Sequence, residues 1–168
     1  WKYIYKNWKN KIMRHGDLFQ ELSSLSPNFY ESNYNEIMEP FSDKQSQSAD
    51  YGGKAFTMRW QPFMYACILG LINKRRVPFQ NRPNDKNKSG DVFNYQVIFN
   101  QGHKILVSVI LSVISLNKDG YKILSDKNKL NEEISNYANG GFEIIREMQD
   151  DGISFGFSDF MTEISERK

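Results

Sequence analysis

The stretch YANGGFEII, residues 137–145, places two adjacent glycines in what otherwise reads as the apolar face of a helix. Each glycine in a helix interior costs about 1 kcal/mol relative to alanine, so a pair of them needs a physical reason. Gly141 lies on the apolar stripe itself, where a missing side chain lets another backbone approach closely. We therefore predict a tight crossing with a helix over 101–116 or with a central helix over 61–73. A helix break at Asn139–Gly140 is the alternative, because Asn-Gly is also a turn signal.

Apolar residues recur at spacings of three and four through most of the chain, which is typical of helices and not of strands. The run from 101 to 116 is rich in β-branched residues, but its polar positions decide for a helix, with Lys104, Ser108, Ser112 and Ser115 at steps of four, four and three. Pro62 fits the first turn of the central helix, and Ser125 or Asp126 can cap the last long helix. The predicted helices cover residues 1–15 (ended by Gly16), 27–40 (closed by Pro40), 61–73, 101–116 and 127–149 (stopped by Gly152), with a short amphipathic piece at 157–167.

Two polar stretches separate these helices and predict loops. Residues 42–54 are polar and lack any period, and residues 73–91 hold two prolines, a glycine and many charges. Loops longer than about 12 to 15 residues are usually functional or disordered, so the second stretch draws attention. The sequence predicts an all-α fold, a single compact helical domain of about five to seven helices with long polar loops. Residues 1–50 form an N-terminal helical extension of this domain and residues 54–150 its core.

The composition describes an ordinary globular chain of 168 residues, 39% hydrophobic and 25% charged. The chain begins with Trp1 and not with methionine, which predicts that it is trimmed from a longer protein. Its longest apolar run, over residues 104–117, is shorter than the roughly 20 residues that a membrane span needs. We expect a cytoplasmic protein without a membrane partner.

The chain offers few groups for catalysis or metal binding. It contains one cysteine, Cys67, in an apolar context, and two histidines, His15 and His103, and no phosphate-loop or metal-binding motif occurs. The paired carboxylates, among them Glu132–Glu133 and Glu143–Glu147, lie at helical-surface spacing and predict solvated faces. We therefore expect no enzyme, no metal and no cofactor, and keep a nucleophile formed by Cys67 and His103 as a third-ranked hypothesis.

Positive charge is concentrated in two segments, while the rest of the chain is net acidic. Such segments neutralise phosphates in nucleic-acid-binding proteins, although they also bind acidic protein surfaces or merely keep a protein soluble. The leading hypothesis is contact with double-stranded DNA or with a DNA-bound partner. The candidate residues are Lys74, Arg75, Arg76, Arg82, Lys86 and Lys88 in the 73–90 stretch, with Lys2, Lys6, Lys9 and Arg14 as a possible additional basic face.

The stretches KAFTMRWQPFMYACILGLINKRRVPF (residues 54–79) and LNEEISNYANGGFEIIREM (residues 130–148) are the most distinctive of the chain. Both resemble segments of the accessory proteins encoded beside bacterial DNA phosphorothioation (Dnd) systems. The resemblance covers residues 54–150, and the Tyr-Ala-Asn-Gly-Gly string is its most specific part. It implies an accessory or DNA-binding subunit of a bacterial DNA-modification, restriction or anti-phage defence system, and no chemistry comes with it. The matching residues are Phe63, Ala66, Leu69, Gly70, Arg75, Arg76, Pro78 and Phe79, then Tyr137, Ala138, Asn139, Gly140, Gly141 and Phe142.

The alternative function is an adaptor that binds other subunits of such a system without touching nucleic acid. The aromatic stripe of Trp1, Tyr5 and Trp8 is large enough to anchor a protein interface. The sequence does not decide the oligomeric state.

Overall fold

The computed structural model describes residues 15–42, 55–80, 82–88, 92–117 and 120–152, and this part of the chain is built from helices without any strand. The all-α prediction is therefore confirmed. In chain order the elements are α2 (His15–Ser23), α3 (Glu31–Asn33), the π-helical η1 (Tyr34–Met38), α4 (Glu39–Phe41), α5 (Trp60–Ile72), α6 (Tyr95–Asn100), α7 (Lys104–Asn117), the 3-10 helix η3 (Gly120–Ser125) and α8 (Lys127–Asp150).

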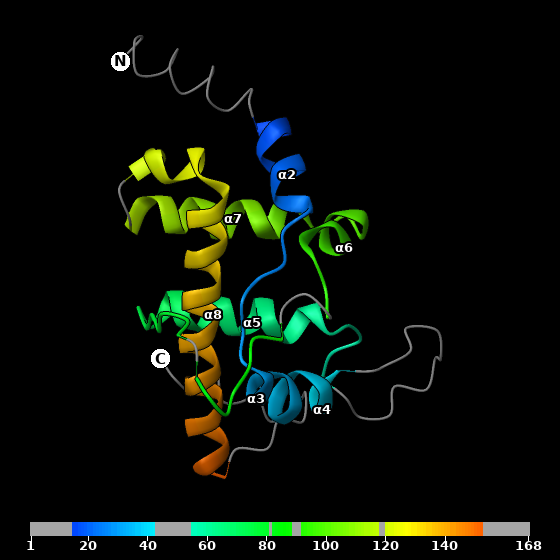
Figure 1. The fold of residues 1–168 in the computed structure, drawn as a ribbon, viewed down its shortest axis with the longest axis vertical. Helices are drawn as coiled ribbons and strands as arrows, with labels where there is room; N and C mark the ends of the chain where they lie inside the picture. Colours follow the sequence, from blue (N-terminus) through cyan, green and yellow to red (C-terminus); the bar gives the residue numbers. More distant parts are fainter. Residues whose placement is uncertain (1–14, 43–54, 81, 89–91, 118–119, 153–168) are drawn as a thin grey trace.

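The fold is organised around α8, which is upright in Figure 1, with α7 crossing near its upper end and α5 crossing near its middle. The crossing with α5 is the most extensive contact between any two of these helices. A Cβ atom on Gly141 would overlap the backbone of Ala66 in α5, and one on Gly70 of α5 would overlap the backbone of Tyr137 in α8. Glycines on both helices therefore bring the two backbones into contact. The tight crossing is confirmed, with the central helix as the partner and with α8 unbroken at Asn139–Gly140.

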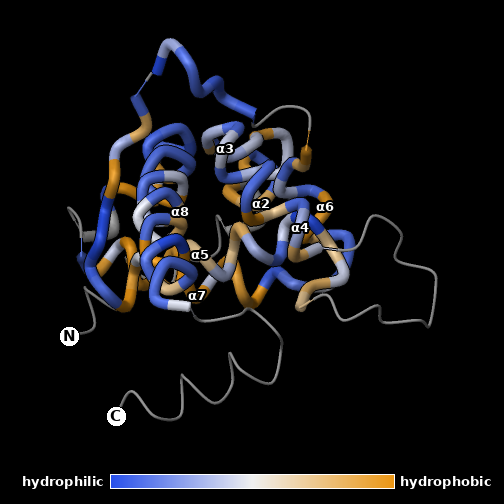
Figure 2. Tube along the Cα trace, turned by 90° about the horizontal axis from the view of Figure 1, so that it is seen from below, coloured by the Kyte–Doolittle hydropathy of each residue, from blue (hydrophilic) through white to orange (hydrophobic). Residues whose placement is uncertain are grey.

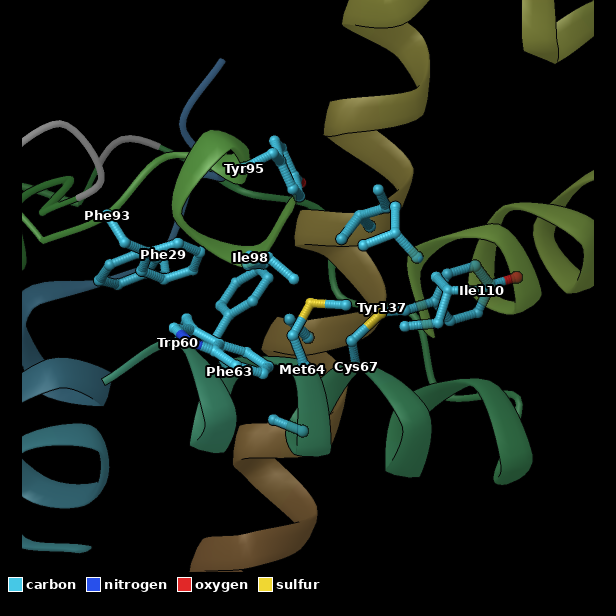
Figure 3. Close-up of a cluster of buried hydrophobic side chains, with 14 of the residues drawn as sticks. Phe29, Trp60, Phe63, Met64, Cys67, Phe93, Tyr95, Ile98, Ile110 and Tyr137 are labelled. Carbon is cyan, nitrogen blue, oxygen red and sulfur yellow. The ribbon is translucent and has the colours of Figure 1, made fainter. Parts of the chain in front are cut away.

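The core fills the angles between the crossed helices. Figure 3 shows its aromatic end, where Phe29, Phe63 and Phe93 gather beside Trp60, and its centre, where Cys67 and Ile110 meet Tyr137. Figure 2 looks along α8, many of whose residues are hydrophilic, although its middle, residues 133–142, is buried all round. Within the described residues no helix is both long and apolar enough to cross a bilayer.

Three predicted boundaries were wrong, each for a local reason. Gly16 lies inside α2 and does not end a helix. The helix predicted from residue 101 begins only at Lys104, because Gly102 adopts a φ of +84° in the turn that separates it from α6, a short helix that was not predicted. Pro40 does not stop its helix, which begins only at Glu31 and continues through Pro40 to Phe41. A proline cannot donate to the carbonyl four residues back, and the turn before it is widened into η1, where the N–H of Glu39 reaches the carbonyl of Tyr34.

Candidate functional site: the 73–88 segment

The 73–88 segment leaves α5 through a helix-ending turn that brings Ile72 and Lys74 to the surface. The N–H of Lys74 donates to the carbonyl of Leu71 (3.2 Å) and that of Arg75 to the carbonyl of Gly70 (2.8 Å), the pattern of a Schellman cap. The residue in the left-handed position of this cap is Lys74, with a φ of +53°. Glycine is the usual residue there, because a side chain in that conformation costs about 1 kcal/mol or more.

The segment then passes directly over the middle of α8. A Cβ on Gly140 would overlap the carbonyl of Arg75, so the first glycine of the YANGG string makes room for the loop and not for a helix. Further along, Asn136 holds the segment twice. Its backbone carbonyl accepts from the N–H of Val77 (3.0 Å), and its side-chain Oδ1 accepts from the N–H of Phe79 (3.0 Å).

Two arginines of the segment form ion pairs with carboxylates of α8 on either side of Gly140. Arg75 binds Glu147 through Nη1 (2.7 Å) and Glu143 through Nη2 (2.8 Å). Arg76 makes a two-pronged pair with Glu133, with Nε and Nη2 at 2.8 and 2.6 Å from the carboxylate oxygens. Hydrogen bonds to these carboxylates raise the pKa of both guanidinium groups, so both stay charged and paired, although the Arg75–Glu147 pair lies at the surface.

The tip of the segment is held against the helix that begins at Glu31. Residues 82–85 form a tight turn, and the carboxylate of Asp85 accepts from the backbone N–H (3.0 Å) and the hydroxyl (2.7 Å) of Ser32. Asp85 thus caps the first turn of another helix, where a negative charge is favoured. Arg82 lies 4.0 Å above the Tyr30 ring and 3.9 Å from Asp85, and Lys88 lies 3.5 Å from Glu31.

Comparison with known protein families shows which family the chain resembles over most of its length. Residues 34–157 match the model of a family described as DNA sulphur modification system-associated protein 4. The chain belongs to this family. The match confirms the resemblance stated for residues 54–150 and reaches beyond it on both sides. Neither a curated protein nor a solved structure gives a significant match.

Most of the residues that carry the family likeness serve the packing described above. Ala66 and Gly70 meet α8, Arg75 and Arg76 bind its carboxylates, and Phe79 stacks on Tyr30 with ring centroids 4.8 Å apart. The likeness to this DNA sulphur modification-associated family therefore reports how the 73–88 segment is attached to the α5–α8 pair.

The six candidate cations of this segment differ in whether a carboxylate lies beside them. Four of them, Arg75, Arg76, Arg82 and Lys88, lie within 4 Å of a carboxylate, whereas Lys74 and Lys86 are exposed and form no ion pair with the described residues. Contact between the six residues and DNA stays a prediction. Lys2, Lys6, Lys9 and Arg14 lie outside the described residues.

The carboxylates of α8 are the residues whose role sequence reasoning missed. Glu133, Glu143 and Glu147 were predicted to be solvated, but all three bind arginines of the segment, and the Glu133 side chain is only 9% exposed. Their partners lie 57 to 72 residues away in the sequence, so no local pattern could reveal them.

Cys67 and His103 are not placed as a catalytic pair. Cys67 is fully buried in α5, and burial raises the pKa of its thiol far above the usual range. A thiol that stays protonated is a poor nucleophile. The ring of His103 instead lies against Trp60, with centroids 5.1 Å apart. Among the described residues no three His, Cys, Asp or Glu side chains come together in a way that could hold a metal ion.

Proposed function

We propose that this chain is a non-catalytic accessory subunit of a bacterial DNA sulphur-modification system with a role in DNA modification, restriction or anti-phage defence. The family membership supports the association with such a system. The inert environment of Cys67 supports a role in assembly over a role in chemistry. The proposal leaves two modes of action, binding to other subunits and binding to DNA, and the charges of the 73–88 segment bear on both.

The mode that the geometry supports best is that of an adaptor, which binds other subunits through the outer edge of the 73–88 segment. The observation that carries this proposal is the internal pairing of the arginines. Arg75 and Arg76 form ion pairs with carboxylates of α8 and so hold the segment to that helix. A loop held in one shape loses little conformational entropy on binding, which favours a docking element. The outer edge consists of the exposed residues Lys74, Pro78, Gln80, Arg82, Pro83, Asn84, Lys86 and Asn87.

The adaptor proposal is tested by co-expressing the chain with the other proteins encoded by the same modification system and measuring complex formation by co-purification and light scattering. Asn84→Arg and Lys86→Glu change the exposed tip of the segment. We expect both to reduce assembly while the thermal midpoint stays the same. Lys129→Glu, an exposed charge reversal on α8, is the matched control. Full assembly of both tip variants would contradict docking through this edge.

A second variant separates the shape of the segment from its surface chemistry. Asn136→Ala removes the Oδ1 acceptor that holds Phe79 but leaves every exposed side chain of the segment in place. We expect slower and weaker assembly with the same partners, together with faster proteolysis within residues 77–88, because the freed loop must be ordered again on binding.

Direct contact with double-stranded DNA is the second candidate. It is favoured by Lys74 and Lys86, whose charges are not compensated by the described residues, and by the five cations of residues 1–14. Lys74 occupies a backbone conformation in which glycine would be more stable, and this unusual position favours a role for the side chain. Among the cations of the 73–88 segment, Lys74 and Lys86 are therefore the best candidates for contact with phosphate.

Titration of a short DNA duplex at two salt concentrations tests this candidate. Lys74→Glu with Lys86→Glu should weaken binding and lower the slope of log K against log salt by about 2, since each lost phosphate contact removes about 0.9. Reversing Arg75 or Arg76 would be a poorer test, because either change also breaks the attachment to α8. An unchanged affinity and salt slope in the double lysine variant would rule out DNA contact through this segment.

A further inference from the structure

Two side-chain amides of α8 are buried where the 73–88 segment and α3 pack on this helix. Asn136 is 0% exposed and Asn139 is 2% exposed. Each amide oxygen accepts a hydrogen bond, but within the described part of the chain neither Nδ2 atom finds an acceptor. A buried donor without a partner has lost its hydration and gained nothing in return, so two of them on one helix require an explanation.

The backbone of the 73–88 segment fixes which atom of Asn136 is left over. The N–H of Phe79 donates to Oδ1 of Asn136 at 3.0 Å. Turning the amide over would place its Nδ2 against that N–H, and two donors would then face each other. The unpaired group of Asn136 is therefore an NH2 donor.

A chain of hydrogen bonds that starts at Arg146 fixes Asn139 in the same way. A guanidinium group only donates, so the atom of Asn33 that lies 2.7 Å from Nη2 of Arg146 is its oxygen. The nitrogen of Asn33 then lies toward Asn139 and donates to its Oδ1 at 3.2 Å. Asn139 is thus also left with an NH2 donor.

The two amides are neighbours on one face of α8. Side chains three positions apart on a helix lie on the same face, with Cβ atoms about 5 to 6 Å apart. A single acceptor between Asn136 and Asn139 can therefore take a hydrogen bond from each of them.

The charge around the amides favours a neutral acceptor over an anion. The arginines that reach this part of α8 already have carboxylate partners. Arg146 lies 2.9 Å from Glu36. Arg75 lies 2.8 Å from Glu143. An anion between the two amides would thus be buried without a counter-charge, which is strongly unfavourable, whereas a water molecule is neutral and small enough for an interior site.

We propose that Asn136 and Asn139 together bind one water molecule in the interior of the protein, with its oxygen accepting a hydrogen bond from each NH2 group. Buried waters in globular proteins typically make about three hydrogen bonds to polar groups that would otherwise stay unpaired. This water joins the amide that holds the 73–88 segment to the amide that holds α3, so both attachments to α8 belong to one network. The site is internal, and it does not depend on whether the outer edge of the segment binds protein or DNA.

Nuclear Overhauser measurements between water and the side-chain N–H groups of the intact, 15N-labelled chain test the proposal. A buried water exchanges slowly, so its cross-peaks have the sign of protein-internal contacts, whereas surface water does not give such peaks. We expect these cross-peaks at the NH2 groups of Asn136 and Asn139. The indole N–H of Trp60 is the internal control, because it is paired with Gln101 at 2.9 Å and should show none.

Asn139→Leu tests whether one water serves both amides. Leucine has a similar shape to asparagine but offers no donor, and the bond between Asn136 and Phe79 stays in place. We expect the long-lived water cross-peak of Asn136 to be lost, since a water with fewer hydrogen bonds is held less firmly. Asn131→Leu is the matched control. It removes an amide of the same helix whose Nδ2 donates to the Ser26 carbonyl at 3.0 Å, and it should leave both cross-peaks unchanged.

The measurement on the parent chain decides even where a leucine variant fails to fold. Absence of a long-lived water signal at both amides would overturn the proposal. A cross-peak of Asn136 that survives Asn139→Leu unchanged would show that the two amides do not share a water. Crystals grown in bromide give an independent check, because an anomalous peak between the two Nδ2 atoms would identify an anion in place of the water.

Discussion

Gly141 of α8 lies directly against the backbone of Ala66 in α5, so closely that a Cβ atom at position 141 would overlap the Ala66 carbonyl. Neither side of this contact can move easily, because each is backbone within a regular helix. The contact therefore sets the distance between the two most extensively packed helices of the fold.

Gly141→Ala should destabilise the protein by more than about 3 kcal/mol, since a single methyl group must push two helices apart. Urea unfolding followed by circular dichroism measures the effect. Glu132→Ala, at an exposed position of the same helix, should change the stability by less than about 0.5 kcal/mol. Gly140→Ala should lie between these two variants, because the backbone that it meets belongs to the 73–88 segment and can shift. A Gly141→Ala variant with unchanged stability would mean that the helices do not cross as described.

Lys74→Gly should stabilise the protein by about 0.5 to 1 kcal/mol, because glycine adopts a φ of +53° without the clash that a side chain causes. Lys74→Ala should give no such gain, since alanine has the same clash. The urea midpoints of the two variants, compared with that of the parent chain, separate a backbone effect from loss of the lysine charge. Equal stability of the glycine and alanine variants would contradict the strained position of Lys74.

Arg76→Met should cost about 2 to 3 kcal/mol, because it leaves the largely buried Glu133 carboxylate without its principal partner. Combining it with Glu133→Gln should recover more than half of this loss, since the neutral amide needs no counter-charge. A double-mutant cycle from four unfolding curves measures the coupling between the two positions. Additive effects would show that the pair contributes no coupling energy.

The stability of the fold should decrease as the pH rises above about 8.5. Burial raises the pKa of the Cys67 thiol in the folded chain. When the pH exceeds the ordinary pKa of a thiol, the unfolded chain has therefore lost a proton that the folded chain retains. The free energy of unfolding then falls by about 1.4 kcal/mol for each pH unit. Buried Tyr95, whose pKa is also raised by desolvation, adds a second decrease above about pH 10.

Cys67→Ala identifies the first of these two decreases. Its free energy of unfolding should stay level from pH 8 to about pH 10, where the tyrosine begins to contribute. Measurements of urea unfolding across this range, for the parent and the variant, check the assignment. A parent chain whose stability is flat up to about pH 10 would rule out a buried thiol in the folded state.

The sequence allowed the three long helices and their crossing to be predicted, because apolar spacing and the glycine pair are local signals. The partner of Gly141 could not be chosen between α5 and α7, since both present small or apolar residues at helical spacing. The attachment of the 73–88 segment was also beyond local reasoning. Arg75 and Arg76 read as a free basic patch until the fold placed Glu133, Glu143 and Glu147 beside them.

The serines of α7 show a subtler limit. Their spacing correctly indicated a helix, but the implied polar stripe is not uniformly solvated, because Ser115 is 2% exposed and its hydroxyl donates to the carbonyl of Ser112. A serine can satisfy its hydroxyl within its own helix, so its position in the pattern does not tell which side faces water.

Asn136 and the five residues after it are committed to internal contacts, from the Asn136 acceptor to the Gly141 crossing. The string NYANGG therefore specifies one way of stacking a loop on two helices, whatever molecule the protein meets. Outward positions such as Gln80, Asn84 and Lys86 lie apart from these contacts, so substitutions there leave the scaffold untouched.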